Sequence, residues 1–176
     1  MPKPVDGVGH PVAVRPLDVH PIAKVSLSQI VGLAEAVDEM GGEADVAVIA
    51  DEVEMDVDRL GPIVSAAEFL GMMAVEGGNL RLTDLSRKAL GASVRGRKAI
   101  FRDIVKDVPV FRQVLEMARA KGRPLTRLEV LGAIANRVGS HASEDVFRAL
   151  VYWGRYCELV SYDSGSELLT LRKPGP

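Results

Sequence analysis

The chain has 176 residues, of which 47% are hydrophobic and 26% charged, and its formal net charge is −2. This composition excludes a disordered polymer and indicates one folded domain or two small ones. The single cysteine, Cys157, excludes an internal disulfide framework. No apolar run approaches the ~18 residues that a membrane-spanning helix needs, and the N-terminus has no apolar signal core. We therefore expect a cytoplasmic protein without direct membrane insertion.

The charges are distributed unevenly along the sequence. Residues 81–127 contain 13 basic and 4 acidic side chains, so the rest of the chain is strongly acidic. Residues 43–58 alone hold seven carboxylates and no basic side chain. Such segregation steers charged partners, or it lets acidic and basic faces neutralise each other within the fold or in a homodimer.

The first predicted unit covers residues 25–92. Ahead of it, residues 1–24 contain five prolines and no hydrophobic period, which predicts a flexible tail or linker. The unit opens at a capping box, Ser26-Leu27-Ser28-Gln29, and Gly41-Gly42 ends its first helix. Hydrophobic spacing and turn residues then predict further elements in this order: a helix at 44–53, a helix at 57–70 capped by Asp56, and strands at 72–75 and 80–82.

A helical block and a second unit follow. Thr83 is expected to cap a helix at 84–90, and residues 93–107 hold a connecting helix at 94–105. The second unit covers residues 108–172, and residues 173–176 are a frayed tail. Its predicted elements are helices at 108–120 and 128–138, the latter opened by a capping box at Thr126 and Glu129, a helix capped by Ser143, and a hairpin that turns at Gly165.

A helix followed by a two-stranded hairpin therefore occurs twice. The predicted fold class is α+β, mostly α, with two winged-helix-like units joined by a helical block. Winged-helix units bind DNA or protein, and they rarely catalyse a reaction alone.

The sequence lacks the patterns of common catalytic sites. There is no glycine-rich loop ending in Gly-Lys-Ser or Gly-Lys-Thr to hold phosphates, and Gly7-Val8-Gly9 follows no strand. The three histidines share no ligand spacing with Cys157, so we expect no metal and no cofactor. Cys157 is interpreted as a small core residue, and the carboxylates of residues 43–58 as a solvated face. We expect no enzymatic activity.

Aromatic residues gather in the last third of the chain. Trp153 and Tyr156 are three residues apart and share a helical face, while Tyr162 lies in the hairpin. These side chains form either the core of the second unit or a partly exposed anchor for a partner. Together with Arg155 they are the candidate partner-binding residues. A small-ligand pocket between the two units is a further alternative.

Basic residues form a second candidate surface, between the two repeats. The candidate patch consists of Arg87, Lys88, Arg95, Lys98 and Arg102. Spacings of three and seven residues place the last three on one helical face. This face binds nucleic acid, binds an acidic protein surface, or is solvated and salt-bridged.

The helices that would read DNA in a winged-helix protein are not basic here. The helix at 57–70 offers Arg59 against Asp58 and Glu68, with Asp56 at its cap. Because DNA binding requires neutralisation of phosphates, an acidic reading helix disfavours it. Nucleic acid is therefore a disfavoured partner, and a winged-helix transcription regulator is the alternative function.

Three stretches of sequence resemble the C-terminal AAA-associated domain, which follows the ATPase domain of nitrate/sulfonate/taurine-type ABC transporters. The Trp153-Gly154-Arg155-Tyr156 run is the most specific piece. The stretches are VSLSQIVGLAE at 25–35, with Gly41-Gly42 and Asp51-Glu52 after it; AEFLG at 67–71, leading to LTDLSR at 82–87; and ALVYWGRYCELVSYD at 149–163.

The resemblance implies an accessory domain without catalytic residues, regulatory in role and associated with an ABC transporter ATPase subunit. It places the protein in the cytoplasm, at the inner face of the membrane when bound to a transporter. No ATPase domain precedes the resemblance in this sequence. The chain is accordingly expected to be either a free-standing member or a fragment of a larger ATPase.

Overall fold

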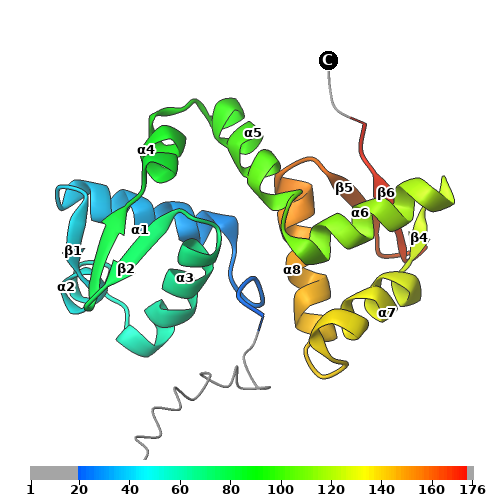
Figure 1. Cartoon of the computed structure of the whole chain (residues 1–176), viewed down its shortest axis with the longest axis horizontal. Helices are drawn as coiled ribbons and strands as arrows, with labels where there is room; N and C mark the ends of the chain where they lie inside the picture. Colours follow the sequence, from blue (N-terminus) through cyan, green and yellow to red (C-terminus); the bar gives the residue numbers. More distant parts are fainter. Residues whose placement is uncertain (1–19, 174–176) are drawn as a thin grey trace, which may run out of the picture.

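A computed structural model describes residues 20–173 and shows two units bridged by two helices (Figure 1). The first unit contains α1 (Leu27–Glu39), β1 (Glu43–Asp45), α2 (Val46–Glu52), α3 (Val57–Phe69), β2 (Met73–Glu76) and β3 (Asn79–Leu82). The bridging helices are α4 (Asp84–Gly91) and α5 (Val94–Val105). The second unit contains α6 (Pro109–Lys121), β4 (Leu125–Thr126), α7 (Arg127–Val138), α8 (Ser143–Tyr156), β5 (Val160–Asp163) and β6 (Leu168–Leu171). The predicted α+β class, mainly helical, is confirmed.

Both units have the same order of elements: helix, strand, helix, helix and hairpin. In the first unit β3 lies between β1 and β2, and in the second β6 lies between β4 and β5, with every pair antiparallel. The repeat predicted from the helix and hairpin therefore extends over six elements. Its first strands, β1 and β4, were not predicted.

Side-chain caps fix where several helices begin. The N–H of Gln29 donates to Ser26 Oγ at 3.1 Å, and the Ser26 N–H donates back to Gln29 Oε1 at 2.9 Å. Thr126 and Glu129 make the same reciprocal pair at the start of α7. Thr83 Oγ1 accepts the N–H of Ser86 at 3.2 Å and starts α4. Each of these three predicted caps is confirmed.

Two helix starts differ from the predictions. Ala44 and Asp45 lie in β1 rather than in a helix, because β3 offers hydrogen-bonding partners there, and Asp45 then caps α2 through the N–H of Ala47 at 2.8 Å. Ser143 does not cap α8. It is the first helical residue, and its hydroxyl donates to the Ser140 carbonyl at 2.8 Å, which leaves Ala142 at the cap position.

The cap of α3 is also different. Asp56 occupies the predicted cap position, but its side chain makes no capping hydrogen bond.

The segment ahead of α1 is packed where it is described. Most of the predicted tail, residues 1–19, lies outside the described residues, as do residues 174–176. Residues 20–24 form a turn in which Ile22 and Ala23 are buried. These five residues are therefore packed against the fold, whereas the sequence predicted a flexible tail up to residue 24. The His20 ring meets Phe69 of α3 edge-on at 5.7 Å, and Lys24 Nζ lies 3.5 Å from Asp145 of α8. This turn therefore contacts both units.

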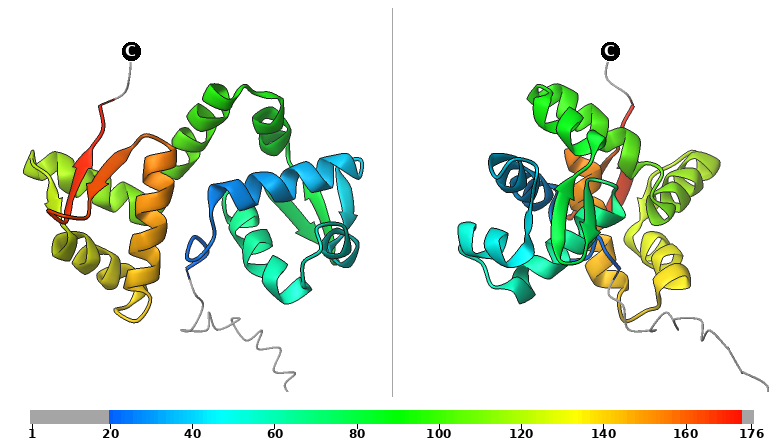
Figure 2. Two further views of the ribbon diagram at one scale, coloured as in Figure 1. Left: turned by 180° about the vertical axis from the view of Figure 1, so that it is seen from behind. Right: turned by 60° about the vertical axis from the view of Figure 1, so that its left-hand side comes forward.

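A single hydrophobic core runs through both units. Phe101 of α5 is fully buried in this core. Phe111 of α6 stacks on Trp153 of α8, with ring centroids 6.4 Å apart. Seen from behind, α8 runs along the side of the second unit that faces the turn before α1 (Figure 2). No helix within residues 20–173 is long and apolar enough to cross a membrane.

Candidate partner-binding surfaces

Trp153 joins the two units and is not exposed. Only 1% of its surface is accessible, and its indole N–H donates to the Val25 carbonyl at 2.7 Å. Because Val25 precedes α1 and Trp153 lies in α8, this buried hydrogen bond ties the beginning of the first unit to the second. Of the two alternatives for the aromatic residues, Trp153 is therefore a core residue and not an exposed anchor. A partner could contact it only if the two units separated.

The other predicted partner-binding residues do not gather around Trp153. Tyr156 is half-buried, its ring edge against Phe101 at 5.9 Å, and burial raises the pKa of its hydroxyl. Tyr162 is half-buried against Phe147 at 5.3 Å. The exposed Arg155 guanidinium donates to the Tyr162 carbonyl, so these two residues do lie together. A role for these three residues in partner binding stays a prediction.

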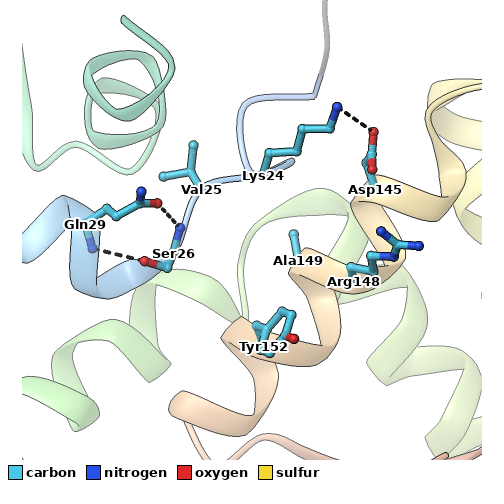
Figure 3. Close-up of a pocket in the computed structure, with 8 residues that line it drawn as sticks. All are labelled: Lys24, Val25, Ser26, Gln29, Asp145, Arg148, Ala149 and Tyr152. Carbon is cyan, nitrogen blue, oxygen red and sulfur yellow. Dashed lines mark hydrogen bonds and ion pairs between the residues drawn. The ribbon is translucent and has the colours of Figure 1, made fainter. Parts of the chain in front are cut away.

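The exposed aromatic of α8 is Tyr152, which belongs to the aromatic group of the last third of the sequence but was not among the candidate partner-binding residues. It is 68% exposed and lines a groove of about 300 Å³ between the start of α1 and α8 (Figure 3). The groove residues are Lys24, Val25, Ser26, Gln29, Asp145, Arg148, Ala149 and Tyr152. The 3.6-residue period of α8 places Tyr152 on the face opposite Leu150, which is buried. This period is the sequence signal that could have predicted an exposed Tyr152.

The groove has an apolar floor and a charged rim. Val25 and Ala149 are buried at its base. Lys24 and Asp145 neutralise each other across it, whereas Arg148 makes no ion pair within residues 20–173. The groove therefore combines one exposed ring with one uncompensated cation, which suits a partner segment that carries an apolar side chain beside a carboxylate.

The five residues of the predicted basic patch differ in their surroundings. Arg87, Lys88 and Arg95 are exposed on α4 and α5. Arg102 instead donates to the Cys157 carbonyl at 2.7 Å and to Glu158 at 2.8 Å, which connects α5 to the end of α8. Lys98 lies over the Tyr156 ring, 5.7 Å from its centroid. Two of the five cations therefore contact α8 or the turn after it, and a role of the five as one basic patch stays a prediction.

The acidic segment is a surface, as its composition predicted. Asp51, Glu52, Glu54, Asp56 and Asp58 are all exposed on and around α2 and α3. None of them forms an ion pair with a basic side chain of residues 20–173. The first unit thus presents uncompensated negative charge on the helix pair that would face DNA in a winged-helix protein.

The pKa shifts of Cys157 and Glu129 follow from burial and from hydrogen bonding. Burial raises the pKa of the Cys157 thiol to about 12, so the thiol stays protonated at neutral pH. Hydrogen bonds from Arg123 and Lys121, and one from the Thr126 N–H, hold the pKa of Glu129 well below its usual range at the start of α7. In the part of the chain that the structure describes, no three His, Cys, Asp or Glu side chains are arranged to hold a metal ion.

Comparison with known proteins gives one match. The model of the C-terminal AAA-associated domain family matches residues 47–163, which is more than half of the chain. No curated protein and no solved structure matches. The match begins in α2 and ends with β5, so it includes the bridging helices and most of both units. The chain therefore belongs to the C-terminal AAA-associated domain family, and this membership associates it with ATPases of the AAA and ABC class.

Proposed function

We propose that this chain is a non-catalytic regulatory domain that docks on the ATPase subunit of an ABC transporter of the nitrate, sulfonate or taurine import type. The observation that carries the proposal is the family match over residues 47–163. Docking would shift the balance between the open and closed states of the ATPase, since a partner that binds one state more tightly favours that state.

The α1–α8 groove supplies the docking surface in this proposal. Tyr152 offers a rigid, exposed ring, and Arg148 offers a charge that no carboxylate of the described chain neutralises. An ATPase segment that places an apolar side chain on the ring and a carboxylate beside Arg148 would bury both. Aromatic and arginine side chains are the residue types that most often dominate binding at protein interfaces.

Each unit is, in this proposal, a winged-helix-like module used for protein contacts. The supporting observation is the shared order of helix, strand, helix, helix and hairpin. The same order also favours the runner-up function, a transcription regulator that contacts DNA through Arg87, Lys88 and Arg95. The uncompensated carboxylates on α2 and α3 weigh against it, because each would face a polyanion.

The proposal is tested first by finding the ATPase and then by mapping the contact. Tagged protein is used to capture partners from a nuclease-treated lysate of the source organism, and mass spectrometry identifies an ABC-type ATPase. The purified ATPase is then titrated with the native chain. We expect saturable binding and an altered rate of ATP hydrolysis.

Two charge reversals distinguish the two functions. Arg148→Glu is expected to weaken binding to the ATPase roughly tenfold or more, because it removes a charged contact and adds a repulsive one. Arg95→Glu makes the same charge change on α5 and should leave ATPase binding intact. If duplex DNA binds the native chain near physiological salt and Arg95→Glu abolishes it, while no ATPase is captured, the regulator function replaces the docking function.

A further inference from the structure

A second hollow lies at the second unit and shares no residue with the α1–α8 groove. It has a volume of about 460 Å³ and lies where α5, α6 and the end of β6 meet. Leu115 of α6, Leu159 and Leu171 supply its apolar lining. The volume falls within the range of ~300–1,000 Å³ that is usual for small-molecule sites.

The polar lining of this hollow is almost entirely cationic. Arg102, Arg119, Arg172 and Lys173 line it together with one carboxylate, Glu158. These residues come from α5, α6, the turn after α8 and the chain after β6, so the fold gathers them from four separate segments. In a protein of net charge −2, this concentration of positive charge requires an explanation.

The charge of the hollow is not neutralised from within. Glu158 already accepts a hydrogen bond from Arg102 at 2.8 Å, and Arg102 also donates to the Cys157 carbonyl. Arg119, Arg172 and Lys173 make no ion pair with any carboxylate of residues 20–173. Three positive charges therefore remain around one hollow with an apolar lining.

Backbone geometry holds one of these cations at the hollow. The Arg172 N–H donates to the Leu159 carbonyl at 2.9 Å, which fastens the chain after β6 to the turn after α8. Glu158 in that turn has a left-handed φ of 56°, so the turn reverses sharply before β5. Arg172 is consequently placed beside the leucines by the hairpin itself.

We propose that this hollow binds a small organic anion, with an oxyanion group held by Arg119, Arg172 and Lys173 and an apolar body resting on the three leucines. Guanidinium groups bind oxyanions through paired, charge-assisted hydrogen bonds. The apolar lining adds the hydrophobic contribution that a bare inorganic ion would lack. The chain then has a ligand site in addition to its proposed protein contact.

Two fluorescent probes with the same ring system test the site. Anilinonaphthalene sulfonate carries an anionic group on an apolar body, and N-phenyl-1-naphthylamine is the same body without the charge. The native full chain should bind the sulfonate saturably at one site and the neutral probe at least roughly tenfold more weakly. Added salt should weaken binding of the anionic probe, because salt screens the attraction between exposed charges.

Variants locate the binding. Arg119→Gln combined with Arg172→Gln should lower the affinity for the anionic probe roughly tenfold or more. The affinity for the neutral probe should stay unchanged. Arg119→Lys with Arg172→Lys keeps the charge, so it should give an intermediate loss. Both arginines are exposed, and circular dichroism checks that each variant remains folded.

Arg59→Gln, at an exposed arginine of α3 in the first unit, is the matched control and should bind the anionic probe as the native chain does. Arg148→Gln, in the α1–α8 groove, tests whether the probe binds there instead. The proposal is overturned if the native chain shows no saturable binding of the anionic probe, or if it binds both probes equally. It is also overturned if Arg148→Gln loses the anionic probe while the Arg119 and Arg172 variants retain it.

Discussion

At the residue scale, Gly154 lies in α8 and faces Val160 of β5. Glycine inside a helix costs about 0.5–1 kcal/mol relative to alanine, so its presence calls for a packing reason. A Cβ added here would overlap Val160 Cγ2 and would lie 3.7 Å from Phe111 Cε1. Both neighbours are buried and β5 follows directly, so the overlap cannot be relieved by a simple side-chain rotation.

Gly154→Ala is therefore expected to lower the free energy of unfolding by about 1–3 kcal/mol, as overpacked cores do. Chemical denaturation measures the change. Gly132→Ala in α7 is the control, because nothing lies within 4 Å of the added Cβ. It should stabilise the protein by up to roughly 1 kcal/mol through its helix propensity. Equal stabilities for the two variants would contradict the packing argument.

Burial of Cys157 predicts how stability depends on pH in alkaline solution. The folded protein holds the thiol pKa at about 12, against an ordinary value of 9.0. Between these pH values the unfolded state loses a proton that the folded state keeps, so the free energy of unfolding falls as pH rises. The fall amounts to on the order of 1–2 kcal/mol between pH 9 and 10.5.

Urea denaturation at a series of pH values, for the native chain and Cys157→Ala, measures this contribution. The variant should be less stable at neutral pH because it leaves a small cavity, but its stability should fall less steeply above pH 9. If both proteins follow the same slope, the thiol does not titrate as its burial requires.

At the scale of elements, the start of α1 depends on one hydroxyl. Ser26 Oγ accepts the N–H of Gln29, and Ser28, two residues on, is exposed and caps nothing. Ser26→Ala should lower the free energy of unfolding by about 1 kcal/mol, while Ser28→Ala should change it little. Thermal unfolding of the two variants decides the point. A loss from Ser28→Ala as large as that from Ser26→Ala would show that the cap is not the cause.

Helices of this chain could be predicted from sequence because their signals are local. The capping boxes at Ser26 and Thr126 and the hydrophobic spacing of residues 94–105 lie within the elements they define. The strands β1 and β4 could not be predicted in this way. They have three and two residues, too few for an alternating pattern, and they exist because β3 and β6 offer them hydrogen-bonding partners.

At the scale of the whole molecule, Trp153 and Val25 hold the two units in one arrangement. Trp153→Phe keeps an aromatic ring near Phe111 but leaves the buried Val25 carbonyl without its indole donor. We expect a loss of about 1–3 kcal/mol in the free energy of unfolding. Tyr152→Phe, the adjacent exposed aromatic, is the control and should be neutral. A neutral Trp153→Phe variant would mean that this hydrogen bond does not secure the units.

The candidate surfaces were harder to predict than the helices, because their members meet only in three dimensions. Sequence spacing placed Lys98 and Arg102 in a basic patch, but it could not show that Tyr156 and the Cys157 carbonyl lie beside them. Likewise, Arg172 reaches the hollow near α6 only through the pairing of β5 with β6. Long-range contacts of this kind leave no local pattern to read.

The placement of α1 and β6 has a practical consequence for recombinant work on this family. The matched residues 47–163 exclude both elements. A protein cut at those limits would lose Leu27, Ile30 and Val37 from the core of the first unit, and the central strand of the second sheet. Such a fragment would expose apolar surface in both halves and would aggregate. Expression limits should therefore follow the two six-element repeats, from residue 20 to residue 173.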